Sequence, residues 1–171
     1  MKMPASDKRI VRLAENAAFL SVALILSFVE SFLPPALLPL PGFKIGLANL
    51  AILSVFYRTE SAANAALIVF CRCLLTFFLF GSVTFLLFSL CGGILVVGML
   101  IVLKRIRGLS FLGISVLCAA AHNLGQLIAA VLLTGPAVLA YLPALFAASA
   151  FYGSINGVLL NLLPEQITSH R

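Results

Sequence analysis

Long apolar segments fill most of the chain, and short polar interruptions divide them into six. A helix needs about 20 apolar residues to cross a membrane, and five of the six segments reach that length. The second has only 14 residues and would extend about 21 Å as a helix, so we expect it to span with help from the loop before it or to be partly re-entrant. The predicted membrane helices cover residues 10–33, 44–57, 61–80, 82–103, 110–133 and 137–163.

The composition is that of a membrane protein. Of the 171 residues, 63% are apolar and 9% are charged, whereas about a quarter of the residues in soluble domains are charged. The basic residues occur at the ends of apolar segments rather than in a patch with interleaved aromatics, so nucleic acid is not an expected partner. We therefore predict an all-α, multi-pass protein of the cell membrane, with residues 1–171 forming one six-helix transmembrane domain in the lipid bilayer.

The distribution of lysine and arginine predicts how the chain crosses the membrane. Loops on the cytoplasmic side carry an excess of these residues, which places both termini in the cytoplasm and the first loop outside. With six spans, the opposite side carries only Lys44. A five-span alternative would move Arg58 outside and remove this asymmetry. The nine basic residues on the cytoplasmic side are Lys2, Lys8, Arg9, Arg12, Arg58, Lys104, Arg105, Arg107 and Arg171.

The first outer loop is rich in proline. Four of the eight prolines fall between Pro34 and Pro41, and proline removes a backbone donor and disfavours helix at the residue before it. Lys44 follows, between Gly42 and Gly46. Irregular backbone at a membrane face persists only where protein or water satisfies its polar groups, so we expect this loop to cover or line a cavity. A plain connector, with Lys44 extending to the interface, is the alternative.

Two ionisable residues within the apolar segments need an explanation, because charge inside a membrane is costly. Arg72 lies near the middle of the third segment, and its guanidinium cannot lose its proton. It therefore needs an anion, a group of carbonyls or water. Glu30, in the outer part of the first segment, is the natural partner. The two residues belong either to a ligand site or to a buried ion pair that fixes helix register.

The fifth segment carries His122, Asn123 and Gln126, three hydrogen-bonding side chains near mid-membrane. Such amides can also hold helices together. With Asn49 of the second segment, they could face one cavity in the outer half of the bundle. A cavity with two fixed cations and several amide or imidazole groups suits an anionic or polar small molecule. The predicted substrate-binding residues are Glu30, Lys44, Asn49, Arg72, His122, Asn123 and Gln126.

Neither catalysis nor a metal or cofactor is expected. Prenyl diphosphate chemistry needs clustered carboxylates to hold magnesium, and the only aspartate is Asp7. The Gly-x-x-x-x-Gly-Lys-Ser/Thr phosphate loop is absent, and no Ser-His-Asp set is available. The four cysteines lie within apolar segments, where cysteine behaves as a small hydrophobic residue.

Small residues recur at a spacing of four in three places. This spacing lets helix backbones approach closely in lipid. The three pairs are Ala14 with Ala18, Ala121 with Gly125, and Gly153 with Gly157.

These features together resemble a known family. They are the six short spans, the Pro-rich loop leading into Lys44-Ile-Gly-Leu-Ala-Asn49, Arg72, and Ala-His122-Asn123-Leu-Gly-Gln126. The chain is similar, over nearly its whole length after the first ten residues, to the family labelled heptaprenyl diphosphate synthase component I. That family is also grouped as a Gx-type transporter, similar to the substrate-binding S components of energy-coupling-factor (ECF) vitamin transporters.

The resemblance implies two different functions. An S component is a six-helix bundle that binds a micronutrient near its outer face and docks on a transmembrane coupling protein driven by two ATPases. Its docking surface includes small alanines on the first helix, which Ala14 and Ala18 match. The cargo would be a small anionic or polar micronutrient or an isoprenoid- or quinone-type precursor. The synthase label implies instead a noncatalytic membrane subunit associated with heptaprenyl diphosphate synthesis, and a purely structural membrane subunit is the third hypothesis.

Overall fold

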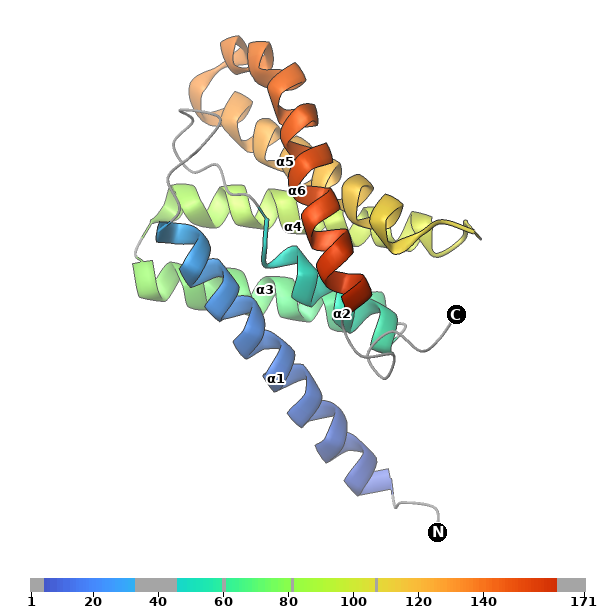
Figure 1. The fold of residues 1–171 in the computed structure, drawn as a ribbon. Helices are drawn as coiled ribbons and strands as arrows, with labels where there is room; N and C mark the ends of the chain where they lie inside the picture. The colour runs from blue at the N-terminus through green and yellow to red at the C-terminus, as the bar shows by residue number, and fades with distance from the viewer. Residues whose placement is uncertain (1–4, 33–45, 60, 81, 107, 163–171) are drawn as a thin grey trace.

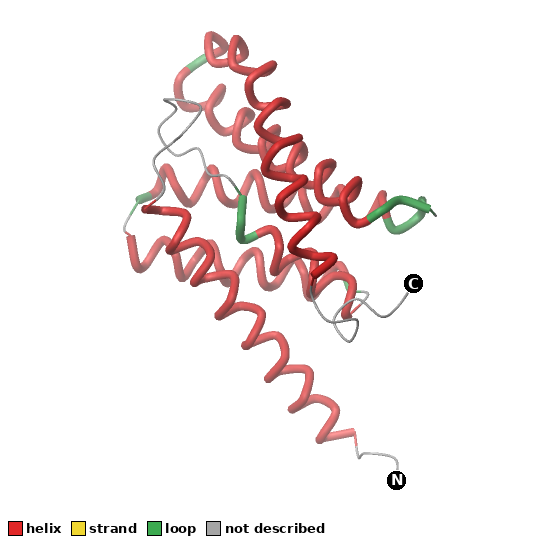
Figure 2. Tube along the Cα trace, viewed as in Figure 1, coloured by secondary structure: helices red, strands yellow, loops and turns green. Residues whose placement is uncertain are grey.

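The computed structural model describes residues 5–32, 46–59, 61–80, 82–106 and 108–162. Within these ranges the chain is helical apart from short connections, and it contains no strand (Figure 2). The elements are α1 (Ala5–Phe32), α2 (Asn49–Thr59), α3 (Ala62–Phe80), α4 (Val83–Leu103), α5 (Phe111–Thr134), the 3₁₀ helix η1 (Pro136–Tyr141) and α6 (Leu142–Leu162).

Five of the helices are long and apolar enough to cross a membrane, which makes the chain a multi-pass membrane protein. α2 is the exception, because its 11 residues extend only about 16 Å, against a hydrocarbon core of about 30 Å. The carboxyl-terminal part of α1 packs on α2 and α3, whereas its amino-terminal half extends away from the other helices (Figure 1).

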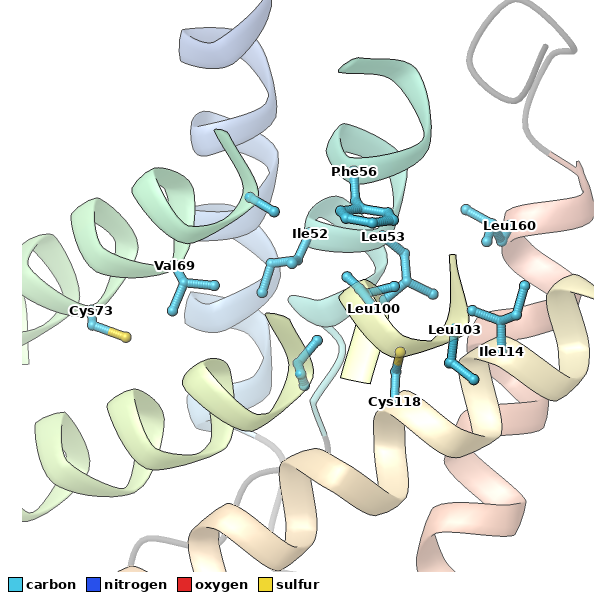
Figure 3. Packing of buried hydrophobic residues seen from close by; sticks show 12 residues of the cluster. Ile52, Leu53, Phe56, Val69, Cys73, Leu100, Leu103, Ile114, Cys118 and Leu160 are labelled. Atoms are coloured by element: carbon cyan, nitrogen blue, oxygen red, sulfur yellow. The ribbon is translucent and has the colours of Figure 1, made fainter. Parts of the chain in front are cut away.

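α2 forms the centre of the bundle. Residues 51–56 of this helix are buried without interruption. Its Ile52, Leu53 and Phe56 share one hydrophobic cluster with residues from every helix except α1 and η1, among them Leu100 of α4 and Leu160 of α6 (Figure 3). A helix segment that is buried on all sides belongs in a core, and residues 51–56 of α2 form such a segment.

The predicted helix bounds hold for α3, α4 and α5, each within one residue. Three boundaries differ. The first segment was expected to begin at residue 10, but α1 begins at Ala5. The second segment was expected to be helical from residue 44, but α2 begins at Asn49, after a turn in which the Asn49 amide donates to the Gly46 carbonyl at 3.0 Å. The last segment is divided into η1 and α6. Pro143 lies in the first turn of α6, where its missing N–H costs nothing.

Basic residues gather at the end of the bundle where α2 meets α3. Arg58 Nη2 and Glu15 Oε1 form an ion pair at 2.7 Å. Lys104, just after α4, places its Nζ 6.0 Å from the centre of the Phe56 ring. Arg58 and Lys104 therefore lie at the same end of the bundle as Glu15 of α1.

Small residues let α5 approach both of its neighbours. A Cβ added at Gly125 would lie 2.4 Å from the carbonyl oxygen of Cys91 on α4. On α6, a Cβ at Gly153 would lie 2.6 Å from the Cα of Val116, and one at Gly157 would lie 2.7 Å from the Cα of Leu112. The expected close approach of backbones is thus confirmed for two of the three small-residue pairs.

We predict that Gly125→Ala destabilises the protein, because the new methyl group would meet the α4 backbone. Overpacking of this kind costs about 1–3 kcal/mol and should lower the melting temperature of the detergent-purified protein. Gly98→Ala on α4 is the matched control, since a Cβ there meets nothing within 4 Å. Equal melting temperatures for the two variants would contradict the packing described for α4 and α5.

Candidate binding site

A polar cluster surrounds the backbone of Gly46, at the turn before α2. The Gly46 amide donates to Oε1 of Glu30 on α1, and its carbonyl accepts from Nδ2 of Asn156 on α6 at 3.4 Å. Both side chains are buried. The start of α2 is therefore held by polar groups from helices on either side of it, inside the bundle.

Glycine at position 46 is required by the side chains around it. Its φ of +87° lies in a region that residues with a Cβ rarely adopt. A Cβ there would also lie 2.8 Å from Nδ2 of Asn49 and 3.3 Å from Cδ2 of His122. Asn49, the first residue of α2, and His122, in the middle of α5, thus both lie close to the backbone of Gly46.

Asn49 is the least satisfied member of this cluster. Its side chain is only 3% exposed, and neither its Oδ1 nor its Nδ2 has a hydrogen-bond partner. A buried amide without partners costs roughly 1–3 kcal/mol or more. Asn49 therefore offers one donor and one acceptor next to Gly46 and His122.

His122 and Gln126 lie one helical turn apart on α5, with Gln126 Nε2 3.2 Å from His122 Nε2. Which of the two nitrogens donates depends on the tautomer of the imidazole. Gly92 of α4 makes room for the ring, because a Cβ there would lie 2.5 Å from Nδ1 of His122. Both α5 side chains are at most 2% exposed.

Arg72 is buried on α3, with 4% of its surface exposed. Its guanidinium contacts the Sγ of Cys73, with Nη2 at 3.9 Å. No carboxylate in the described part of the chain forms an ion pair with it, because Glu15 with Arg58 is the pair formed there. The hypothesised ion pair of Glu30 with Arg72 is therefore not present, and the Glu30 carboxylate accepts from Gly46 instead.

Helix register places Arg72 beside the start of α2. Ile68 of α3 packs in one cluster with Ala51 and Val55 of α2 and Ala23 of α1. Arg72 lies one turn after Ile68 on α3. Because α2 runs antiparallel to α3, moving the same way along α2 leads back toward Gly46. The backbone of Arg72 thus lies at about the level of the turn that precedes α2.

The side chain of Asn123 hydrogen-bonds to α6. Its Nδ2 donates to Ser149 Oγ at 2.8 Å and to the Leu145 carbonyl at 3.3 Å. Both acceptors belong to α6, so Asn123 joins α5 to α6 on a side of α5 away from Gly46. Amide side chains commonly join membrane helices in this way.

We predict that Asn123→Ala lowers stability by roughly 1–2 kcal/mol, the effect of losing a buried hydrogen bond, and leaves cargo binding unchanged. Thermal unfolding and bound-cargo content would be measured on the same preparation. Ser154→Ala on α6 is the control, because the Ser154 hydroxyl only donates to the Ala150 carbonyl of its own helix. Loss of cargo in Asn123→Ala with unchanged stability would show that Asn123 binds ligand after all.

The structure thus brings together four of the seven predicted residues, Glu30, Asn49, His122 and Gln126, with Arg72 at the same level. Lys44 lies outside the described residues. Asn156 was not predicted, because its position in α6 suggested the inner half of the membrane, away from an outer site. The sequence does show an amide between Gly153 and Gly157, two glycines at helix-packing spacing. It does not show how deep in the bundle α2 begins.

Chemically, the cluster can recognise a polar ligand through hydrogen bonds. It combines a carboxylate, an imidazole, three amides and a nearby guanidinium, all shielded from water. Such groups fix the orientation of a polar ligand through hydrogen bonds. Across the described ranges, no three His, Cys, Asp or Glu side chains gather as a metal site would require.

Comparison with known proteins gives one match. The family model described as heptaprenyl diphosphate synthase component I matches residues 19–163, which include α2 to α6 and the carboxyl-terminal half of α1. Searches of curated proteins and of solved structures found no match. Because the family model covers most of the chain, including every residue of the polar cluster, this multi-pass membrane protein belongs to the heptaprenyl diphosphate synthase component I family.

Proposed function

We propose that the chain is the membrane-embedded S component of an ECF-type uptake transporter. It captures a small anionic or polar micronutrient, or an isoprenoid- or quinone-type precursor, at the extracytoplasmic face. The observation that carries this proposal is the enclosed polar cluster around Gly46, to which α1, α2, α5 and α6 all contribute. Polar groups at this depth are costly, and an unpartnered Asn49 and an unpaired Arg72 are more than packing requires.

The exposed face of α1 supports docking on a coupling protein. Ala14 and Ala18 are exposed, and next to them Ile10 is 66% and Leu13 73% exposed. A surface of small and apolar residues lets another helix approach closely in lipid. On this proposal a transmembrane coupling protein packs against this half of α1, and its two ATPase subunits supply the energy.

Purification of the tagged chain from its native membrane in a mild detergent tests the assignment. We expect a transmembrane coupling protein and two ATPases to accompany it in fixed proportion. Recovery of a soluble, aspartate-rich prenyl diphosphate synthase in their place would contradict the transporter assignment.

That second outcome corresponds to an alternative that the family's description favours. The chain would then be a noncatalytic membrane subunit associated with heptaprenyl diphosphate synthesis. Asp7, its only aspartate, could not form the carboxylate cluster that magnesium needs, so catalysis would belong to the soluble partner. This alternative requires that adding the chain change the rate or the product length of that synthase.

A further inference from the structure

No carboxylate in the described part of the chain forms an ion pair with Arg72. The guanidinium stays protonated under all physiological conditions, and it is 4% exposed. The guanidinium of Arg72 contacts the thiol of Cys73 at 3.9 Å, which is a weak acceptor without charge. Burying a cation without an anion is strongly unfavourable, so a group of opposite charge is needed at this position.

The acidic residues that the structure describes are committed elsewhere. Glu30 accepts from the Gly46 amide, and Glu15 is paired with Arg58. Asp7 is exposed in the first turn of α1. None of these carboxylates forms an ion pair with Arg72.

The chemistry of the site distinguishes between anions. A guanidinium is a planar fork that matches a carboxylate in two parallel hydrogen bonds. A monocarboxylate brings one negative charge to this fork, whereas a phosphate dianion would bring a second one into a low-dielectric cluster that already contains the buried Glu30 carboxylate. The free donor and acceptor of Asn49 then suit an uncharged polar group on the same molecule.

We propose that the cargo is a small monocarboxylate, whose carboxylate binds Arg72 and whose uncharged polar group binds Asn49. This inference rests on the proposed capture function and specifies its substrate class. It also implies that Arg72 is retained for binding at the expense of stability.

Small anions test the proposal on the purified chain alone. Melting temperature would be measured in sodium acetate, sodium phosphate and sodium chloride at equal ionic strength, and with acetamide as the neutral analogue of acetate. We expect acetate to raise the melting temperature by several degrees, through binding to the folded state, and the other three to raise it less. Arg72→Met should abolish the acetate shift, and in chloride its melting temperature should equal or exceed that of the wild type.

Two further variants keep the test decisive if Arg72→Met fails to fold. Arg72→Lys preserves the charge but loses the planar fork, so its acetate shift should be smaller. Arg58→Met removes an arginine outside the cluster and should keep the full shift. A larger shift with phosphate, an equal shift in Arg72→Lys, or no acetate shift in the wild type would each overturn the proposal. These results are independent of partner purification, so the substrate class and the transporter assignment can fail separately.

Discussion

Arg72→Gln is expected to strip the protein of its cargo while leaving it folded. Removing one partner of a buried, charged hydrogen-bonded pair costs about 2–5 kcal/mol, which lowers affinity by roughly 30-fold to more than 1,000-fold. The fold should survive, because no ion pair within the described chain depends on this guanidinium. The measurement is quantitative mass spectrometry of small molecules extracted from equal amounts of purified wild-type and variant protein.

Arg58→Gln is the matched control for this experiment. It removes an arginine that pairs with Glu15 near the membrane surface, where the side chains are about one-third exposed, at 33% and 31%. Exposed pairs contribute about 0–1 kcal/mol, so both stability and cargo should be nearly unchanged. Equal cargo in wild type and Arg72→Gln would remove Arg72 from the site.

Ala14→Trp and Ala18→Trp are expected to abolish association with the coupling protein without reducing cargo binding. A large ring on the exposed half of α1 blocks the close helix contact that small residues permit. Ala14 and Ala18 both lie more than three helical turns before Glu30 on α1. The measurement is co-purification of the ATPases with each variant, together with its bound-cargo content.

Ala147→Trp provides the comparison for the α1 variants, because Ala147 is an exposed alanine on α6. It should retain both partners and cargo. If Ala147→Trp loses the ATPases as well, the docking face is not specific to α1. If the α1 variants lose cargo while keeping their partners, binding and docking are not divided between the two regions as proposed.

Much of the helical layout could be predicted from the sequence. α4 and α5 begin where expected because Ser82 and Ser110 cap them, accepting from the amides of Phe85 and Gly113 at 3.3 and 3.1 Å. Serine at this position is a strong helix-start signal. α5 ends at Thr134 because the next residue, Gly135, has a φ of +92°, which glycine adopts readily at the end of a helix.

The site could be predicted only in part, because periodicity reports which side of a helix is buried but not the depth of one helix relative to another. α2 begins well inside the bundle, and this depth brings Gly46 to Asn156. The Glu30 carboxylate meets a backbone amide there, which no spacing of side chains would reveal. Asn123 is adjacent in sequence to His122, yet it points to Ser149 of α6.

Native mass spectrometry of the gently purified wild-type protein tests the central claim most directly. A capture subunit should carry one small molecule per chain, and its exact mass should correspond to an anionic metabolite with a carboxylate. A protein that carries only bulk lipid under conditions that keep it folded, even after incubation with a small-molecule extract of its own cells, would contradict the proposed capture function.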